Sequence, residues 1–383
     1  MPQTIDIEIE KIGLAQALEG FLARLLESGS VDAILVQQHR AEGSMIMPVL
    51  LRNPEQLCGI QPLSPAFALN SARLVSRLTK GDPGGAIAAV LRPCEIRAFI
   101  ELVKLNQGRT GNLTIIGTDC PGALQNSELF TFMEKHGQGA ADAFIDSSFP
   151  ENGEYADCPE LAPACRTCIR PTPEGADLEV GLFGLLPGDR IQVYSRTPRG
   201  EEILEAIGAE PAEPHPGRKD AIESLVSRRT KARREMAEKT SSETDTLEKL
   251  EQYFSRCINC YNCRTACPVC YCRQCVFETD ACEHEPAKYM KWAGRKGGLK
   301  MPEDTLFYHL TRMAHMSTAC VGCGQCSNVC PSGIAVSELF VSVGEKTQAA
   351  FDYVAGRSID EPPPLSVFFE DEFSDVVGIK DKG

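Results

Sequence analysis

Short apolar runs alternate with amphipathic stretches in the first half of the chain. Apolar residues recur at helical spacing over residues 12–27, and a strand-like run follows at residues 31–36. Two further apolar runs, at residues 86–91 and 113–117, are separated by the helical pattern IRAFIELVKL. Strands that alternate with helices in this way predict a mostly parallel sheet with crossover helices. We therefore expect an α/β domain over residues 1–210.

The pattern changes after this first half. The segment AIGAEPAEPHPG at residues 206–217 is rich in proline, glutamate and glycine and marks a domain boundary. Residues 218–239 then carry dense mixed charge with few apolar positions, which is typical of a solvated helix. The alternative for its basic cluster is a docking surface for an acidic partner. We predict a charged helical linker over residues 211–250.

Two cysteine runs organise the second half, and each reads C-x2-C-x2-C-x3-C-P. In this spacing three thiolates hold one 4Fe-4S cluster, and the fourth cysteine binds the other cluster. The first cluster is assigned to Cys257, Cys260, Cys263 and Cys330. The second is assigned to Cys320, Cys323, Cys326 and Cys267. Leu306, Leu310, Met313 and Ala314 recur at helical spacing before the second run, which predicts an all-α dicluster domain over residues 251–355.

Cysteines of the first half suggest a third cluster. Cys94 and Cys120 each follow the end of a predicted strand, where ligands gather in parallel sheets. Together with Cys165 and Cys168 they could supply the four thiolates of a 4Fe-4S cluster. Either Cys94 or Cys120 taken alone would be a small buried apolar residue. Cys58 and Cys158 are interpreted as spare thiols, with Cys158 as the substitute ligand.

Four more cysteines lie between the two runs, at Cys270, Cys272, Cys275 and Cys282. They are open to three interpretations: a fourth 4Fe-4S cluster, a zinc site, or spare thiols near a cluster. Zinc favours C-x2-C pairs, and only Cys272 with Cys275 has that spacing. We predict a further metal centre here as an open hypothesis.

The segments RPCEIRAFIELVKL, IIGTDCPG and CRTC with ADLEVGLFG resemble the beta subunits of deazaflavin-reducing hydrogenases and deazaflavin-linked formate dehydrogenases. The resemblance covers residues 86–184 and implies a 4Fe-4S cluster at Cys94, Cys120, Cys165 and Cys168 beside FAD. It places Asp177, Gly181 and Gly184 near the flavin. The sequence departs from the family at Arg92-Pro93-Cys94-Glu95, and its large cluster domain is appended after the α/β domain. That domain resembles the helical ferredoxin of heterodisulfide-reductase small subunits.

Composition and charge exclude several other classes of function. A net charge of −14 argues against nucleic-acid binding, and no apolar run reaches the length of a membrane span. With 18 cysteines and no evident signal peptide, metal binding is favoured over disulfides, and we expect a cytoplasmic protein of an organism that lives with little oxygen. Two candidate partner surfaces remain. One is the basic patch of Lys291, Arg295, Lys296 and Lys300 around Trp292, and the other is the acidic tail at 356–383 with Phe368, Phe369 and Phe373.

Together the cysteine patterns predict an electron-transfer subunit of an anaerobic oxidoreductase complex with at least three 4Fe-4S clusters, and the resemblance implies that it also holds FAD. By resemblance, its redox partner would be a formate dehydrogenase, a hydrogenase or a heterodisulfide-reductase-like subunit. No acid–base constellation for a substrate is evident. The alternative is an electron conduit without flavin that links two redox enzymes and catalyses nothing itself. A third hypothesis is a scaffold in which the cysteines hold zinc.

Overall fold

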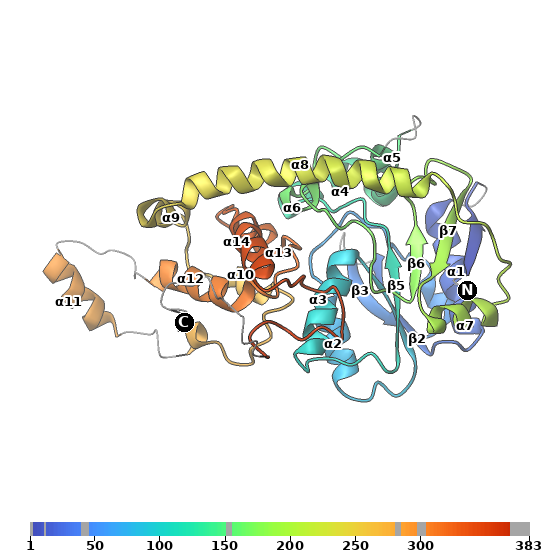
Figure 1. The fold of residues 1–383 in the computed structure, drawn as a ribbon, viewed down its shortest axis with the longest axis horizontal. Coiled ribbons are helices and arrows are strands. Elements are labelled where there is room, and N and C mark those ends of the chain that lie inside the picture. The colour runs from blue at the N-terminus through green and yellow to red at the C-terminus, as the bar shows by residue number, and fades with distance from the viewer. Residues whose placement is uncertain are drawn as a thin grey trace, which may run out of the picture.

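The fold is built on one seven-stranded sheet with helices around it (Figure 1). The computed structural model describes residues 3–10, 13–39, 46–150, 155–279, 285–296 and 304–367. The strands follow the order β1-β7-β6-β5-β4-β2-β3 across the sheet. Their bounds are β1 (Thr4–Glu8), β2 (Ala33–His39), β3 (Ile46–Leu51), β4 (Ile87–Leu91), β5 (Leu113–Thr118), β6 (Leu178–Gly181) and β7 (Arg190–Ser195).

The helices fall into two sets along the chain. Those of the sheet region are α1 (Leu14–Glu27), η1 (Pro54–Leu57), α2 (Ala72–Lys80), α3 (Pro93–Lys104), α4 (Asn126–His136), η2 (Gly137–Gly139), α5 (Ala140–Ser148), α6 (Pro163–Arg166) and α7 (Pro198–Ala206). Those of the second half are α8 (Arg218–Thr244), α9 (Leu247–Tyr253), α10 (Asn262–Thr265), η3 (Val276–Glu278), α11 (Pro286–Lys296), α12 (Asp304–Met316), α13 (Gln325–Asn328) and α14 (Val336–Ala350). Among the described residues, no helix is both long and apolar enough to cross a membrane.

The sheet is mixed, which corrects the prediction of a mostly parallel sheet. The pairs β2–β4, β4–β5 and β5–β6 are parallel, as the alternation of strands and helices predicted. The pairs β1–β7, β6–β7 and β2–β3 are antiparallel. Parallel neighbours need a crossover of a dozen or more residues, and the short connections from β2 to β3 and from β6 to β7 permit only antiparallel pairing.

Two apolar cores lie on the two faces of the sheet. One contains α1 with residues of β1, β6 and β7, among them Leu22, Leu25 and Ile191. The other contains Ile96 and Phe99 of α3, and it continues into the second half through residues of α12 and α14. Because this second core is shared, the sheet region and the helical region pack against each other directly.

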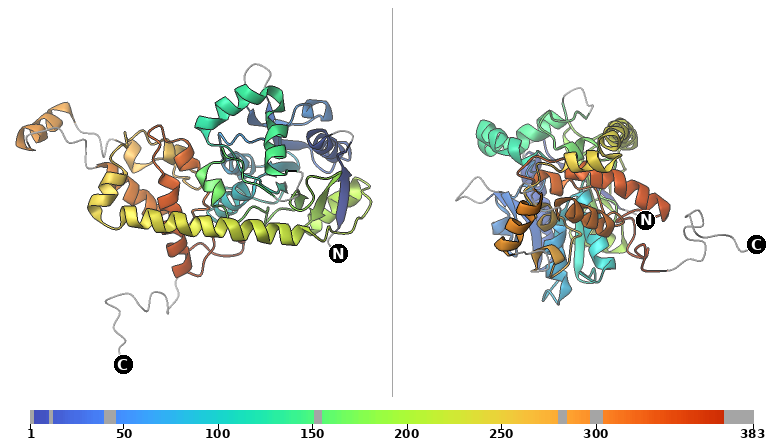
Figure 2. Two further views of the ribbon diagram at one scale, coloured as in Figure 1. Left: turned by 90° about the horizontal axis from the view of Figure 1, so that it is seen from above. Right: turned by 90° about the vertical axis from the view of Figure 1, so that its left-hand side faces the viewer.

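Helix α8 is the longest element, with 27 residues, and it lies along both regions (Figures 1 and 2). Its charged sequence predicted a solvated helix, and one face of the helix contradicts this. Arg218, Leu225, Arg229 and Thr240 of α8 are buried. The buried arginines face the loops that carry the cysteines of the sheet region.

Candidate iron–sulfur centres

The structure brings together the four cysteines predicted for the third cluster. Cys94 lies in the first turn of α3, directly after β4, and Cys120 follows β5. Cys165 belongs to α6, and Cys168 comes two residues after this short helix. All four thiols line one cavity, together with Cys323 of the second cysteine run. Strand ends and a separate C-x2-C pair therefore meet at one place, as the sequence predicted.

Backbone contacts fix the loops of this site. The Cys120 amide donates to the carbonyl of Pro171, and Leu124 forms an isolated bridge with Leu161. Gly122 has a φ of 123°, and a Cβ atom there would lie 2.6 Å from Leu161 Cδ2. Only glycine allows the two loops to approach this closely in that conformation.

Buried arginines lie at this site: Arg92 and Arg229 line the same cavity, and Arg97 lines a neighbouring one together with Cys168. Arg92, Arg97 and Arg229 are 5%, 5% and 1% exposed. Arg92 donates to the carbonyls of Ser64 and Ala66, and Arg97 donates to those of Arg170 and Val321. Among the described residues, the guanidinium groups of Arg92 and Arg97 form no ion pair with a carboxylate, whereas that of Arg229 pairs with Asp157 at 2.8 Å. A buried cation without a counter-charge lowers the stability of the fold, so we expect an anion to bind at this site.

The cysteine pKa values reflect this balance of burial and charge. Burial raises the pKa of Cys94 and of Cys120, and it raises that of Cys165 to about 12. At Cys168 burial is outweighed by Arg97 and Arg229, which lower the pKa of the thiol. Iron binds the thiolate form, so the arginines favour the charge state that a cluster ligand needs.

An ion-pair network next to the site anchors the start of α8. Arg218 binds both oxygens of the Asp119 carboxylate and also binds Glu179. The Asp119 carboxylate accepts from the amides of Leu182 and Phe183 at 2.7 and 3.0 Å. Burial opposes the charge of Arg218, but the hydrogen bond and charge of Asp119 and the charge of Glu179 raise its pKa. Sequence reasoning missed this network because Asp119 and Glu179 lie 99 and 39 residues before Arg218.

The two cysteine runs form two further groups of thiols. Burial raises the pKa of Cys257, and the nearby Cys263, Cys260 and Cys330 raise it further. Burial likewise raises the pKa of Cys326, with further increases from Cys267, Cys323 and Cys320. These neighbours fall within the crosswise sets that the spacing predicts, and the ligand assignment itself stays a prediction.

Helix α12 contacts the first group through polar side chains that the sequence did not single out. Arg312 Nη1 donates to Cys263 Sγ at 3.1 Å, and Tyr308 Oη lies 3.4 Å from the same sulfur. His309 Nε2 lies 3.4 Å from Cys257 Sγ, and burial lowers the pKa of His309 to about 3. The predicted apolar stripe of this helix is partly wrong, since Met313 is buried while Leu310 is 41% exposed.

The second group of thiols lies beside the site of the sheet region. Burial raises the pKa of Cys94, and the largest contribution from a neighbouring charge comes from Cys323. Gly324 has a φ of 74°, and a Cβ atom there would lie 2.3 Å from Ala164 Cβ. The side chain of Gln325 donates to the carbonyl of Phe67 at 2.7 Å. The loop that carries Cys323 is therefore packed against the loop that carries Cys165.

Buried nitrogen atoms without a partner test whether these places suit iron–sulfur clusters. Within the described residues, buried nitrogen atoms without a hydrogen-bond partner include Arg92 Nη1, Arg229 Nε, His309 Nδ1 and Arg312 Nε. All four belong to side chains that line the cavity of the sheet region or contact the first cysteine run. A 4Fe-4S cluster with four thiolates is an anion whose sulfur atoms accept hydrogen bonds, so the residues present fit this group.

Comparisons with known proteins support the cluster chemistry. A family model described as a 4Fe-4S dicluster domain matches residues 253–334. The F420-dependent formate dehydrogenase subunit beta of Methanocaldococcus jannaschii is 26% identical over 378 residues, covering 92% of this chain and 94% of that protein. The F420-dependent formate dehydrogenase 1 subunit beta of Methanococcus maripaludis is 26% identical over 385 residues, covering 93% and 94%.

The resemblance predicted from the sequence is confirmed. This chain is related over most of its length to beta subunits of F420-dependent formate dehydrogenases, and it contains a 4Fe-4S dicluster domain. A chain of the F420-reducing hydrogenase complex from Methanosarcina barkeri superposes with a TM-score of 0.45 and 16% identity, covering 64% of this chain and 94% of that chain. That likeness is too loose to establish a common fold.

The residues predicted to lie near a flavin are occupied by contacts within the chain. The Asp177 carboxylate accepts from the Ile115 amide and from Thr197 Oγ1 at 2.8 and 2.6 Å. A Cβ atom at Gly181 would lie 2.8 Å from Tyr194 Cε2, and one at Gly184 would lie 2.9 Å from Arg218 Cα. The start of α8 fills the space beside both glycines, so these residues do not fit a flavin.

Backbone amides of a glycine-rich turn such as residues 81–85 could bind the phosphates of a flavin, but here carboxylates already accept from them. Asp82 Oδ1 accepts from the Gly84 amide at 2.9 Å, and Asp32 Oδ2 accepts from the Ala86 amide at 2.7 Å. A Cβ atom at Gly85 would lie 2.4 Å from Asp32 Oδ2. Carboxylates that cap these amides disfavour a phosphate at the same place.

The predicted fourth metal centre is only partly within the described residues. Cys270 packs against the core shared by the two regions, and Cys275 packs near Phe277 and Tyr308. Cys272 is exposed, and Cys282 lies outside the described residues. In the part of the chain that the structure describes, no three His, Cys, Asp or Glu side chains are placed to hold a single metal ion.

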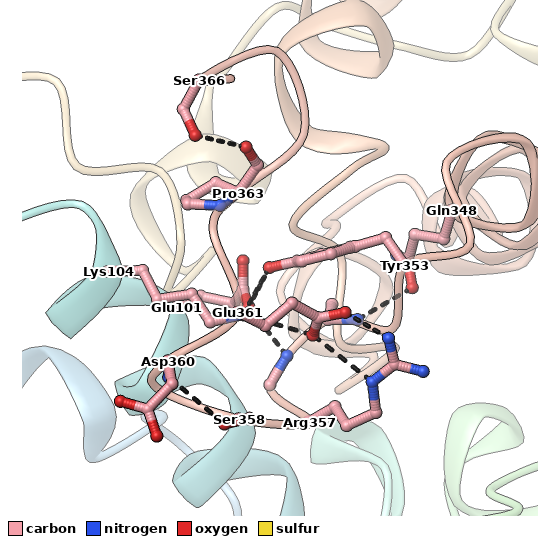
Figure 3. A network of polar contacts seen from close by, with 12 residues as sticks. Glu101, Lys104, Gln348, Tyr353, Arg357, Ser358, Asp360, Glu361, Pro363 and Ser366 are labelled. Atoms are coloured by element: carbon pink, nitrogen blue, oxygen red, sulfur yellow. Dashed lines mark hydrogen bonds and ion pairs between the residues drawn. The ribbon is translucent and has the colours of Figure 1, made fainter. Parts of the chain in front are cut away.

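The two candidate partner surfaces are described only in part. Lys291 and Arg295 are exposed on α11, while Lys300 and the tail aromatics Phe368, Phe369 and Phe373 lie outside the described residues. The beginning of the tail folds back onto α3 (Figure 3). Glu101, which is 1% exposed, accepts from Lys104 Nζ, Tyr353 Oη and the Gly356 amide at 2.9, 2.6 and 2.7 Å.

Proposed function

We propose that this chain is the electron-transfer subunit of a multi-subunit oxidoreductase and that it holds three 4Fe-4S clusters in a row. Cys257, Cys260, Cys263 and Cys330 would bind the first. Cys320, Cys323, Cys326 and Cys267 would bind the second. Cys94, Cys120, Cys165 and Cys168 would bind the third. Such clusters carry one electron at a time, which suits a relay between redox enzymes.

One observation carries this proposal. The four thiols of the sheet region line a single cavity that also reaches Cys323, a ligand assigned to the second cluster. The second and first clusters are linked by the crosswise cysteines, because Cys263 lies in α10 and Cys267 follows just after the end of this short helix. This order supports a path from the third site through the second to the first. Cys260 of the first site is exposed, so the helical region offers an end for exchange with a partner.

The relatives support the class of partner. Both curated relatives are beta subunits of F420-dependent formate dehydrogenases. By this likeness, we propose that the chain serves a catalytic subunit that oxidises or reduces a small substrate, such as formate. Near the cysteines of the sheet region, its own arginines hold loops and balance charge.

We favour a conduit that has no flavin at Asp177, Gly181 and Gly184. Those residues are engaged by Thr197, Tyr194 and Arg218. The likeness to F420-dependent formate dehydrogenases favours the other candidate, in which a flavin exchanges a hydride with F420 and passes on single electrons. A flavin would then need a site formed by other residues.

The content of iron, zinc and flavin per chain tests the proposal, on protein purified without oxygen and then incubated with FAD. We expect about twelve iron atoms, from three 4Fe-4S clusters, with little zinc and no retained FAD. About eight iron atoms would overturn the third site. About one FAD per chain would overturn the flavin-free conduit and favour the flavin-dependent subunit. Zinc in place of iron would contradict both.

A further inference from the structure

Helix α12 points one polar face at the sulfur atoms of the first cysteine group. Tyr308, His309 and Arg312 are 1%, 1% and 5% exposed. Tyr308 Oη and Arg312 Nη1 lie 3.4 and 3.1 Å from Cys263 Sγ, and His309 Nε2 lies 3.4 Å from Cys257 Sγ. Among the described residues, the sulfur atoms of Cys94, Cys120, Cys165 and Cys168 accept no hydrogen bond from a side chain. In the part of the chain that the structure describes, no side chain donates to the sulfur atoms of the second group either, so these contacts are confined to the first group.

The chemistry of these contacts fixes which group donates. A cysteine that ligates iron is a thiolate and has no proton to give. Tyr308 must then donate to Cys263, and the guanidinium of Arg312 can only donate. The same sulfur thus receives a neutral and a charge-assisted hydrogen bond, the second of which is the stronger kind.

Other contacts hold the donors in place. The His309 ring stacks on Phe254 with ring centres 3.8 Å apart and an angle of 7°. The Arg312 guanidinium lies 4.7 Å from the centre of the Phe340 ring, and its Nη2 donates to the Cys263 carbonyl at 3.2 Å. These side chains cannot turn away from the sulfur atoms without leaving their packed positions.

The charge of Arg312 has no counter-charge from a carboxylate. Within the described residues, Arg312 forms no ion pair with Asp or Glu, although it is almost fully buried. Reduction of a cluster adds one negative charge to the thiolate-bound core. A buried cation and donors to sulfur stabilise that added charge more than they stabilise the oxidised cluster.

We propose that Arg312, together with Tyr308 and His309, raises the reduction potential of the cluster bound by Cys257, Cys260, Cys263 and Cys330. This inference rests on the proposed function, because it requires that cluster to be present. The effect on the second cluster is smaller, since the hydrogen bonds of Arg312 go to Cys263. The three residues act on the potential through the ligands and are positioning residues. Because of these residues, an electron on the chain would reside preferentially on the first cluster, at the exposed end of the row.

A redox titration of the whole chain followed by electron paramagnetic resonance tests the inference. Tyr308→Phe removes only the hydroxyl, Arg312→Gln removes the charge, and Arg312→Lys restores it. Met313→Leu serves as the matched control, since Met313 is buried on the same helix and the change nearly conserves volume. The Cys260→Ser variant identifies the signal of the first cluster, because Cys260 is an exposed ligand assigned to that cluster alone.

We expect the midpoint of the first cluster to shift to more negative potential in Arg312→Gln and, by less, in Tyr308→Phe. Arg312→Lys should recover part of the shift, and Met313→Leu should leave the midpoint unchanged. An unchanged midpoint in Tyr308→Phe and Arg312→Gln, with iron content as in the parent, would overturn the inference. Equal shifts of both clusters would also overturn it. A parent protein that lacks the clusters would instead refute the proposed function, which keeps the two failures distinct.

Discussion

The cysteine site of the sheet region and the first cysteine group of the helical region are stabilised in different ways. In the sheet region, four cysteines arrive from three distant loops, and buried arginines supply charge around the cavity. In the helical region, three cysteines come from one short run, and donors from α12 bind their sulfur atoms directly. The first arrangement depends on long-range packing, and the second depends on local spacing and one helix.

This difference predicts how strongly each site is disturbed by substitutions elsewhere in the chain. Each loop of the sheet-region site is held by contacts to distant segments, such as the ion pairs of Arg218 with Asp119 and Glu179. Loss of one such contact loosens a whole loop. The first group keeps three of its ligands within a single turn-rich segment, so distant changes should disturb it less. Four substitutions test this comparison, in order of decreasing expected effect.

Replacement of one ligand should have the largest effect. We expect Cys120→Ser to lose about four of about twelve iron atoms, because a 4Fe-4S cluster is lost as a unit. The resonance signals of the two clusters in the helical region should persist. Cys158→Ser is the control, since Cys158 is buried in a separate small core and its thiol contacts Glu160 at 2.9 Å. Equal iron loss in the two variants would contradict the assignment of the third site.

The second largest effect is expected from removal of the buried positive charge of Arg218 at the start of α8. Arg218→Gln leaves Asp119 and Glu179 without their shared partner, which we expect to cost about 3–5 kcal/mol of unfolding free energy. Thermal unfolding of anaerobic protein measures the change. Arg190→Ala should change stability little, because its ion pairs are exposed and screened by solvent. Iron should be lost from the sheet-region site before the helical region, and the reverse order would count against the comparison.

Close packing between the two regions gives a third, smaller effect. Gly324 and Gly333 both have positive φ, at 74° and 61°, but only a Cβ atom at Gly324 would collide with Ala164. We expect Gly333→Ala to cost about 1 kcal/mol from backbone strain alone. Gly324→Ala should cost about 2–4 kcal/mol, since overpacking adds to the strain. Equal thermal midpoints for the two variants would show that the loops of Cys323 and Cys165 are not in tight contact.

The smallest effect is expected from loss of a contact that holds the beginning of the tail on α3. Tyr353→Phe removes one of three donors to the buried Glu101 carboxylate (Figure 3). We expect a loss of about 1–2 kcal/mol in unfolding free energy, from one hydrogen bond to a charged group. Ser366→Ala, at an exposed position of the same tail, should change stability by less than about 0.5 kcal/mol. A larger loss for Ser366→Ala would contradict the importance of the Glu101 contact.

Local patterns carried much of the prediction. The spacing of Cys257 to Cys267 and of Cys320 to Cys330 depends only on neighbouring residues, so it indicated the dicluster domain directly. The apolar runs of β2, β4 and β5 gave the parallel centre of the sheet for the same reason. The antiparallel pairing of the edge strands was not predicted, because it depends on short connections and on a partner strand distant in sequence.

The polar contacts could not be predicted in this way. A charged run such as that of α8 resembles a solvated helix until Asp119 and Glu179, distant in sequence, are known to face it. On α12, apolar spacing drew attention to Leu310, which is 41% exposed, while Tyr308 and Arg312 make the contacts to sulfur. Whether an arginine can be buried depends on the anion that it faces, and the anions that face Arg218, namely Asp119 and Glu179, are distant from it in sequence.

Helix α8 has a consequence for the cooperativity of unfolding. Arg218 ties it to the sheet through Asp119, and Arg233 ties it to α14 through Glu345 at 2.5 Å. A helix of 27 residues is roughly 40 Å long, so one rigid element crosses both regions. Melting either region frees the helix and exposes the core that they share. We therefore expect one calorimetric transition for the whole molecule, and either half expressed alone should be an unstable fragment.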